Sequence, residues 1–216
     1  MKFPNAFRGI KKIWLAELLM LLFVAASIIS VVVAVTNSSL VDEKVVLNSS
    51  AETTVGLLVI VTGLLVLVAF VLNLVGLINA RTDDSAFRIA LLVTLLGIAA
   101  SVVQVIWSKN QGLVKWMDTL TTIFSMFATY YVLTGIANLA EKLSDSATKA
   151  LALKSRTLVE GTFCATAIFK LIINIFKIQE TSTIYLIISI VALVLELVSY
   201  ILYLRALSKG KKMLAQ

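Results

Sequence analysis

The sequence predicts an all-α membrane protein, a bundle of six transmembrane helices with its N- and C-termini in the cytoplasm. Of its 216 residues 60% are hydrophobic, and the mean hydropathy is +1.00. A soluble domain is typically about 45–50% apolar. The apolar residues come in blocks of about 20, the length that spans a hydrocarbon core of about 30 Å. The connections are too short for a soluble domain, so residues 1–216 are expected to form a single multi-pass membrane domain.

The chain begins with a short segment, residues 1–12, that predicts an amphipathic N-terminal lead-in. Its apolar residues recur at helical spacing, while Arg8, Lys11 and Lys12 populate the other side. We expect these three to bind anionic headgroups of the lipid bilayer; an ordinary positively charged start to a membrane helix is the alternative. The apolar run that follows exceeds the 7–15 residues of a signal peptide, which favours a retained anchor.

Six spans follow from the apolar blocks. They are expected at about 13–35, 55–78, 87–107, 120–140, 157–178 and 184–204.

The segments between the predicted spans also predict local features. Residues 36–54 form an acidic loop whose triplets at Asn37 and Asn48 are glycosylation candidates in a secretory protein and chance in a bacterial one. Asp84 or Ser85 can cap the third helix. The fifth helix is expected to begin near Ser146 and to enter the membrane near residue 157.

The distribution of basic residues predicts the topology. With the N-terminus inside, the inner segments hold fourteen of the nineteen Lys and Arg residues, the outer segments hold four, and Lys170 lies within a span. Such a bias over short loops indicates cytoplasmic segments. Residues 71–86 and 132–147 also match at a constant offset of 61, which a duplicated helical hairpin or the general likeness of apolar helices explains.

The sequence argues against several classes of function. The chain has no histidine and one cysteine, Cys164, and it lacks nucleophile-elbow, metal-protease and phosphate-loop motifs. Capping explains Asp83 and Asp84 better than a metal-dependent transferase does. The basic residues flank apolar blocks, which argues against nucleic-acid binding. We therefore expect no enzyme activity, no metal and no cofactor.

Charge deep in apolar sequence marks the candidate site. Lys170 and Asn174 share one face of the fifth span, and Glu196 lies mid-way along the sixth. Counting from the outer boundary puts Lys170 and Glu196 at depths that differ by about 6 Å, which predicts an ion pair. The same count puts Tyr130 and Tyr131 level with that pair. The sequence thus predicts a mid-membrane polar layer.

Two hypotheses about function follow. The first is a non-enzymatic interaction or accessory component of the cytoplasmic membrane, with self-association or other membrane proteins as partners, in which a Lys170–Glu196 clamp is structural. The alternative is a small channel or transporter for an ion, proton or small solute that uses the polar layer. The spans lack the proline breaks common in transporters. The start of the chain, residues 6–14, resembles those of small bacterial multi-pass proteins, which favours a bacterial cytoplasmic membrane.

Overall fold

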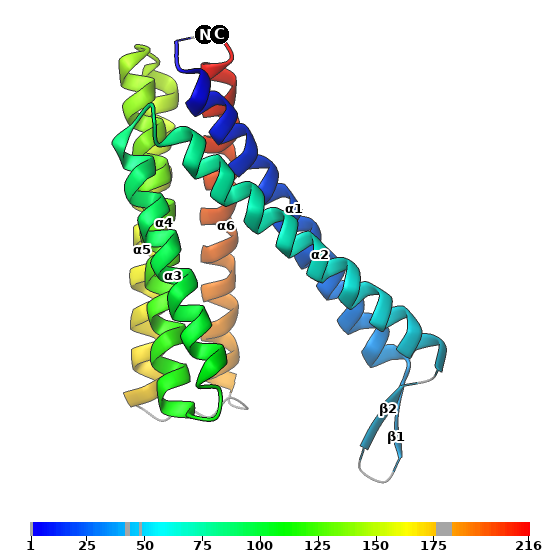
Figure 1. The fold of residues 1–216 in the computed structure, drawn as a ribbon. Coiled ribbons are helices and arrows are strands. Elements are labelled where there is room, and N and C mark those ends of the chain that lie inside the picture. The colour runs from blue at the N-terminus through cyan, green and yellow to red at the C-terminus, as the bar shows by residue number, and fades with distance from the viewer. Residues whose placement is uncertain (1, 42–43, 48, 176–182) are drawn as a thin grey trace. The chain divides into compact units, whose positions relative to one another are not determined.

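The computed structural model describes residues 2–41, 44–47, 49–175 and 183–216. These residues form six helices and one short hairpin of two strands (Figure 1). The helices are α1 (Pro4–Thr36), α2 (Ser49–Ala80), α3 (Ser85–Ile106), α4 (Gln111–Lys142), α5 (Ser146–Ile175) and α6 (Thr183–Leu214).

Over the part that the structure describes, each predicted span falls within one of these helices, except that the third was expected to end at Trp107, the residue directly after α3. The lead-in is continuous with the first span, so α1 is a single helix. The predicted start of the fifth helix at Ser146 is confirmed, while its predicted end at residue 178 lies outside the described residues. The basic tail was expected beyond the last span, and α6 carries it as helix up to Leu214.

The acidic loop is the main local difference from the expected fold. Within it, β1 (Ser38–Val41) and β2 (Lys44–Leu47) pair antiparallel, with Ser38 opposite Leu47. The β-branched residues and leucines at this tip favour strands. The segment expected as a loop thus contains a short hairpin, and the described chain remains overwhelmingly helical.

Five of the described helices are long and apolar enough to cross a membrane: α1, α2 from Glu52, α3, α4 from Gly112 and α6 from Tyr185. The protein therefore has the make-up of an α-helical membrane protein. The large apolar side chains exposed along these helices, such as Ile60 at 64% and Val105 at 75%, suit contact with lipid.

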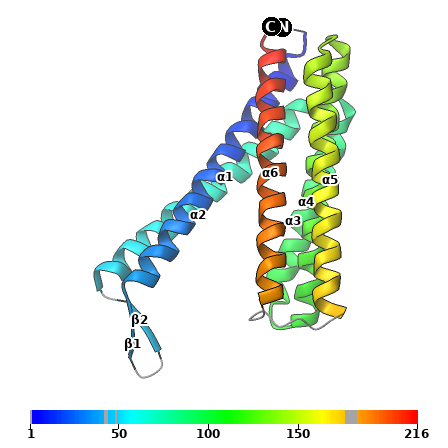
Figure 2. The same ribbon diagram turned by 180° about the vertical axis from the view of Figure 1, so that it is seen from behind.

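The chain divides into two compact units. One comprises residues 12–76, which are most of α1, the hairpin and most of α2. The other comprises residues 1–11 and 77–216, which we call the bundle unit. In the bundle unit α3 packs on α4, α4 on α5 and α5 on α6, and α4 also contacts α6. Successive helices from α3 to α6 run antiparallel, as the two views show (Figures 1 and 2).

The closely packed core of the bundle unit lies toward one end. Phe87 of α3, Leu133 and Ile136 of α4 and Leu207 of α6 are fully buried. Ile10, close to the N-terminus, is buried with no exposed surface. We call this the basic end, because most Lys and Arg residues of the unit lie on the elements that meet there: Lys2, Arg8, Lys11, Arg81, Arg88, Lys142, Lys149, Lys154, Arg156, Arg205, Lys209, Lys211 and Lys212.

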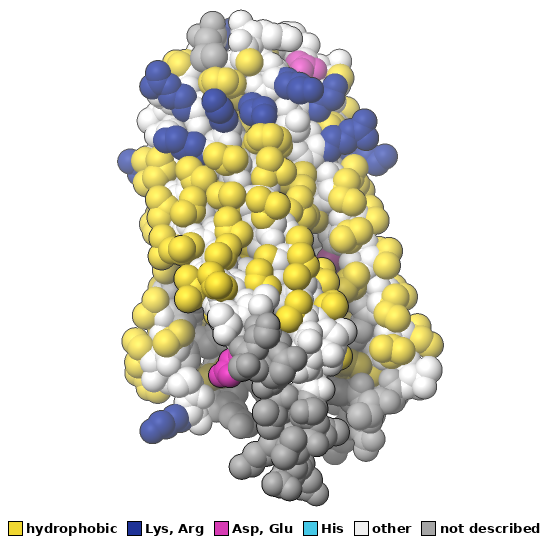
Figure 3. Space-filling model, turned by 90° about the vertical axis from the view of Figure 1, so that its right-hand side faces the viewer, with side chains coloured by type: hydrophobic (Ala, Val, Ile, Leu, Met, Phe, Trp, Pro, Cys, Tyr) yellow, Lys and Arg dark blue, Asp and Glu magenta, His cyan; other side chains and the backbone are white. Residues whose placement is uncertain are grey.

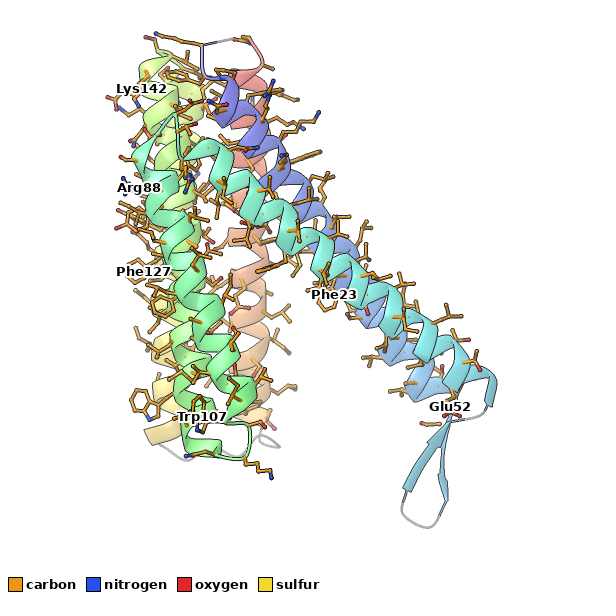
Figure 4. All side chains as sticks on the ribbon, in the orientation of Figure 1. Phe23, Glu52, Arg88, Trp107, Phe127 and Lys142 are labelled. Carbon is orange, nitrogen blue, oxygen red and sulfur yellow. The ribbon has the colours of Figure 1, made fainter. Side chains whose placement is uncertain are left out.

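The chain termini and the α4–α5 turn meet at the basic end. Phe3, Ser144, Leu214 and Gln216 line one hollow of about 360 Å³. Since Ser144 follows α4 and Gln216 follows α6, α5 and α6 must each run the length of the bundle between these points. Figure 4 shows Lys142 and Arg88 toward this end and Trp107 at the other.

Candidate functional site

The residues predicted to form the site divide into those with described side chains and those without. Glu196, Tyr130 and Tyr131 are described, whereas the side chains of Lys170 and Asn174 lie outside the described part of the structure. The predicted Lys170–Glu196 ion pair therefore stays a prediction, and only the backbone register of α5 against α6 bears on it.

Two hydrogen bonds fix that register. The Ser155 hydroxyl donates to the Leu202 carbonyl at 3.2 Å, and the Ser199 hydroxyl donates to the Leu158 carbonyl at 3.5 Å. Each step along α5 thus matches one step back along α6, which brings Gly161 level with Glu196. Lys170 lies nine residues beyond Gly161, or about 14 Å along the axis. This register puts more helix between the two residues than the depth count of about 6 Å did, and the ion pair itself stays a prediction.

Tyr130 and Tyr131 lie together on α4, and Tyr130 contacts Arg156 of α5. Their rings form an edge-to-face pair with centroids 5.1 Å apart. The Arg156 guanidinium lies over the Tyr130 ring, 5.0 Å from its centroid. Arg156 is five residues, about 8 Å, closer to the basic end than Gly161 is. The long Arg156 side chain makes this contact, so the contact does not fix the level of Tyr130 along α5, and the predicted single polar layer stays a prediction.

Arg156 is the polar residue that the sequence reading missed. Its Nη1 donates to the Thr134 hydroxyl at a long 3.4 Å, and its buried Nε has no acceptor among the described residues. No described carboxylate lies within ion-pair distance of it. Sequence reasoning treated it as a flanking positive charge. The available signal was its position ten residues inside a helix predicted to begin at Ser146.

Glu196 is exposed on the surface of α6. Leu193, three residues before it and on the same face, is 63% exposed. None of the cations whose side chains the structure describes pairs with Glu196. A carboxylate in this apolar setting needs a cation, hydrogen-bond donors or a proton to offset its desolvation.

The two adjacent carboxylates at the α2–α3 turn are structural. Asp84 caps α3 by accepting from the Ala86 N–H at 3.0 Å, as the sequence predicted, and its side chain is 5% exposed. Asn138 donates to its Oδ1 at 3.2 Å and Lys142 donates to its Oδ2 at 3.0 Å. These bonds join the start of α3 to the last turns of α4.

Asp83 acts on a different helix. Its Oδ2 accepts a hydrogen bond of 2.6 Å from the backbone N–H of Ala6, in the first turn of α1. An anionic acceptor satisfies one of the free N–H groups there and complements the positive end of the helix dipole. Phe3 places its ring under the Lys142 ammonium, 5.9 Å away. The N-terminal segment is thus tied to the α3–α4 corner.

The second turn repeats the capping chemistry at the predicted offset of 61. Asp145 accepts from the N–H of Thr148 at 2.9 Å and from its hydroxyl at 2.7 Å. The Thr148 hydroxyl and N–H hold the pKa of Asp145 below its ordinary value of 3.8. α3 and α5 begin 61 residues apart, at Ser85 and Ser146, each directly after a capping aspartate. The two turns therefore each carry a capping aspartate at the matching position.

Most hydroxyl groups in the spans bond to their own helix. Examples are Ser27 to the Phe23 carbonyl, Thr62 to the Leu58 carbonyl and Thr94 to the Ala90 carbonyl, at 2.8–2.9 Å. The buried Thr162 and Ser199 hydroxyls instead bond to one another across α5 and α6. Among the described residues, no three His, Cys, Asp or Glu side chains are grouped to hold a metal ion.

On the face seen in Figure 3, Lys and Arg side chains gather toward one end and hydrophobic side chains cover the middle. Comparison of the chain with protein-family models, with curated proteins and with solved structures finds no match. The function of the site is therefore inferred from the chemistry of its residues.

Proposed function

We propose that the chain is a non-enzymatic interaction component of a membrane, which binds another membrane protein through the face of α6 that carries Glu196. In this proposal the chain is one domain of six spans, namely the five apolar helices and α5. Both of its termini lie in the cytoplasm of a bacterial cell. The main observation in support of the proposal is that the Glu196 side chain is exposed. The partner it fits is a membrane helix with a lysine or arginine at mid-span.

The position of Glu196 is the first support. It lies 13 residues, about 20 Å, from the start of α6 at Thr183, within the apolar run. An isolated charge at the centre of a span costs about 2.5–3.5 kcal/mol or more. A cation from a partner helix offsets that cost and makes association specific.

The rest of this chain offers little to neutralise it. In the unit of residues 12–76, the charged residues whose side chains the structure describes are Lys12, Glu17 and Glu52. Lys12 is the first residue of that unit, so its spans bring no described cation to mid-membrane. Lys170 is separated from the level of Glu196 by about 14 Å of helix.

The hydroxyl groups argue against a conduction pathway. A solute or proton path needs polar groups directed at a shared lumen. Ser101, Thr121 and Thr129, like Ser27 and Thr62, donate to carbonyls one turn back in their own helices. Hydroxyls bonded in this way stabilise the helix and are poorly available to a permeant species.

Site-specific photo-crosslinking in native membranes tests the proposal. A photoreactive residue at Leu193 lies on the face of Glu196, and a matched one at Val194 lies on nearly the opposite face; both positions are exposed. We expect the Leu193 position to capture one membrane protein whose mid-span Lys or Arg is required for capture. Glu196→Gln should reduce the yield strongly.

Two results would overturn the proposal. Equal yields from Leu193 and Val194, unaffected by Glu196→Gln, would show that the face is ordinary lipid contact. Proton or ion flux in proteoliposomes that stops with Glu196→Gln would instead support the channel or transporter alternative.

A further inference from the structure

Arg156 is a cation without a counter-ion in a setting that demands one. Of the five N–H donors of its guanidinium, one reaches a described acceptor, the Thr134 hydroxyl at 3.4 Å. The Thr134 hydroxyl donates its own hydrogen to the Tyr130 carbonyl at 2.9 Å, so it can accept from Arg156. The buried Nε is left without an acceptor.

The nearest acidic residues on the same helices do not neutralise it. Glu160 lies one turn farther along α5 and forms no ion pair in the described structure. Glu141, at the end of α4, pairs with Lys149 at 2.8 Å. The Tyr130 ring contributes its negative face to the guanidinium but no formal charge.

If α5 crosses the membrane, Arg156 comes close to the headgroup region. It lies ten residues, about 15 Å, into α5, beyond Lys149 and Lys154. The described α5 is 30 residues, or about 45 Å, long, and the hydrocarbon core takes about 30 Å of this. With the far end of α5 at the opposite boundary, Arg156 lies where hydrocarbon meets headgroups.

We propose that Arg156, stacked on Tyr130 between α4 and α5, binds a phosphate group, and that this group belongs to an anionic lipid headgroup. The guanidinium binds phosphate through charge-assisted N–H groups; Nε is buried and one Nη1–H is directed at Thr134, so the Nη2 group supplies the donors for the phosphate. Free phosphate shares this chemistry. The level of Arg156 in the membrane favours the lipid.

Lipid titration of the purified full chain in uncharged detergent tests the site. We expect phosphatidylglycerol to raise the melting temperature saturably, phosphatidylcholine to act more weakly, and sodium phosphate to have little effect. Arg156→Gln should weaken the apparent affinity for phosphatidylglycerol by at least about tenfold, because it removes charge-assisted hydrogen bonds. Lys154→Gln removes the same charge from an exposed neighbour and should change it less than about threefold.

The outcomes separate the sources of phosphate. A response to sodium phosphate equal to that of the lipid would assign the site to free phosphate and overturn the lipid assignment. Equal half-saturation in the parent and Arg156→Gln, or an equal loss in Lys154→Gln, would overturn the site itself.

Two further measurements test the proposal if the Arg156→Gln variant does not fold. Arg156→Lys keeps the charge and removes the paired donors, so it should retain a weakened response. In the unaltered chain, a phosphatidylglycerol with a photoreactive headgroup should label peptides that contain Tyr130 or Arg156. Labelling confined to other peptides would contradict the proposal.

Discussion

Asp84 accepts three hydrogen bonds from two helices with a side chain that is 5% exposed. Removal of a buried, hydrogen-bonded charge costs more than removal of an exposed one, because its partners lose their only compensation. The bundle unit offers both kinds of ion pair for comparison.

We expect Asp84→Ala to destabilise the protein by about 2–4 kcal/mol, through loss of the α3 cap and of the Lys142 and Asn138 bonds. The matched control is Glu141→Gln. It breaks a pair whose side chains are 64% and 37% exposed and should cost less than about 1 kcal/mol. Thermal unfolding in detergent measures both; similar losses would contradict the role given to Asp84.

Gly135 tests close packing between α3 and α4. A Cβ at this position would lie 2.6 Å from Cε2 of Phe87, which is fully buried. Gly135→Ala should therefore cost about 1–3 kcal/mol despite its better helix propensity. Gly161→Ala, with nothing within 4 Å, should be neutral or stabilising by up to about 1 kcal/mol. A smaller side chain at Phe87 should reduce the Gly135→Ala penalty.

At the scale of elements, α5 and α6 are held by polar contacts as well as apolar ones. Thr162 and Ser199 are each 7% exposed, and their hydroxyls bond to one another. A double-mutant cycle with Thr162→Val and Ser199→Ala should give a coupling of about 0.6 kcal/mol and at most about 1.7. No measurable coupling would mean that each hydroxyl is satisfied by its own helix.

The Asp145 cap makes the α4–α5 turn sensitive to acid. Its pKa is lowered by the Thr148 hydroxyl and N–H, so its contribution is fully present above the ordinary value of 3.8. That contribution is lost as the pH falls through the lower, folded-state pKa. Thr148→Val should narrow the difference in melting temperature between pH 7 and pH 3. An unchanged difference would show that the cap does not govern acid stability.

The number and order of the helices could be predicted from sequence, whereas several of their ends and their relative register could not. Apolar periodicity and the Asp84 cap located α3, and the polar residues after Glu141 located the start of α5 at Ser146. Depth was counted from presumed membrane boundaries, which shift by several residues when helices extend into the headgroups. The Ser155–Leu202 contact fixes the register of α5 against α6 without reference to such boundaries.

At the scale of the whole molecule, the account depends on α5 crossing the membrane with its neighbours. Five helices have the length and hydropathy of spans, and α5 is not among them. It carries five charged residues between Ser146 and Ile175. Its antiparallel packing against α4 and α6 nevertheless requires the same length of bundle, because Ser144 and Gln216 line one hollow.

Cysteine accessibility in intact cells tests this central claim. In a Cys164→Ser background, single cysteines replace the exposed residues Ser108, Ser144 and Gln216. With six spans, a membrane-impermeant maleimide should label position 108 in intact cells and should label positions 144 and 216 only after permeabilisation. If α5 does not cross, positions 144 and 216 will lie on opposite sides, and labelling of one without the other in intact cells would contradict the account.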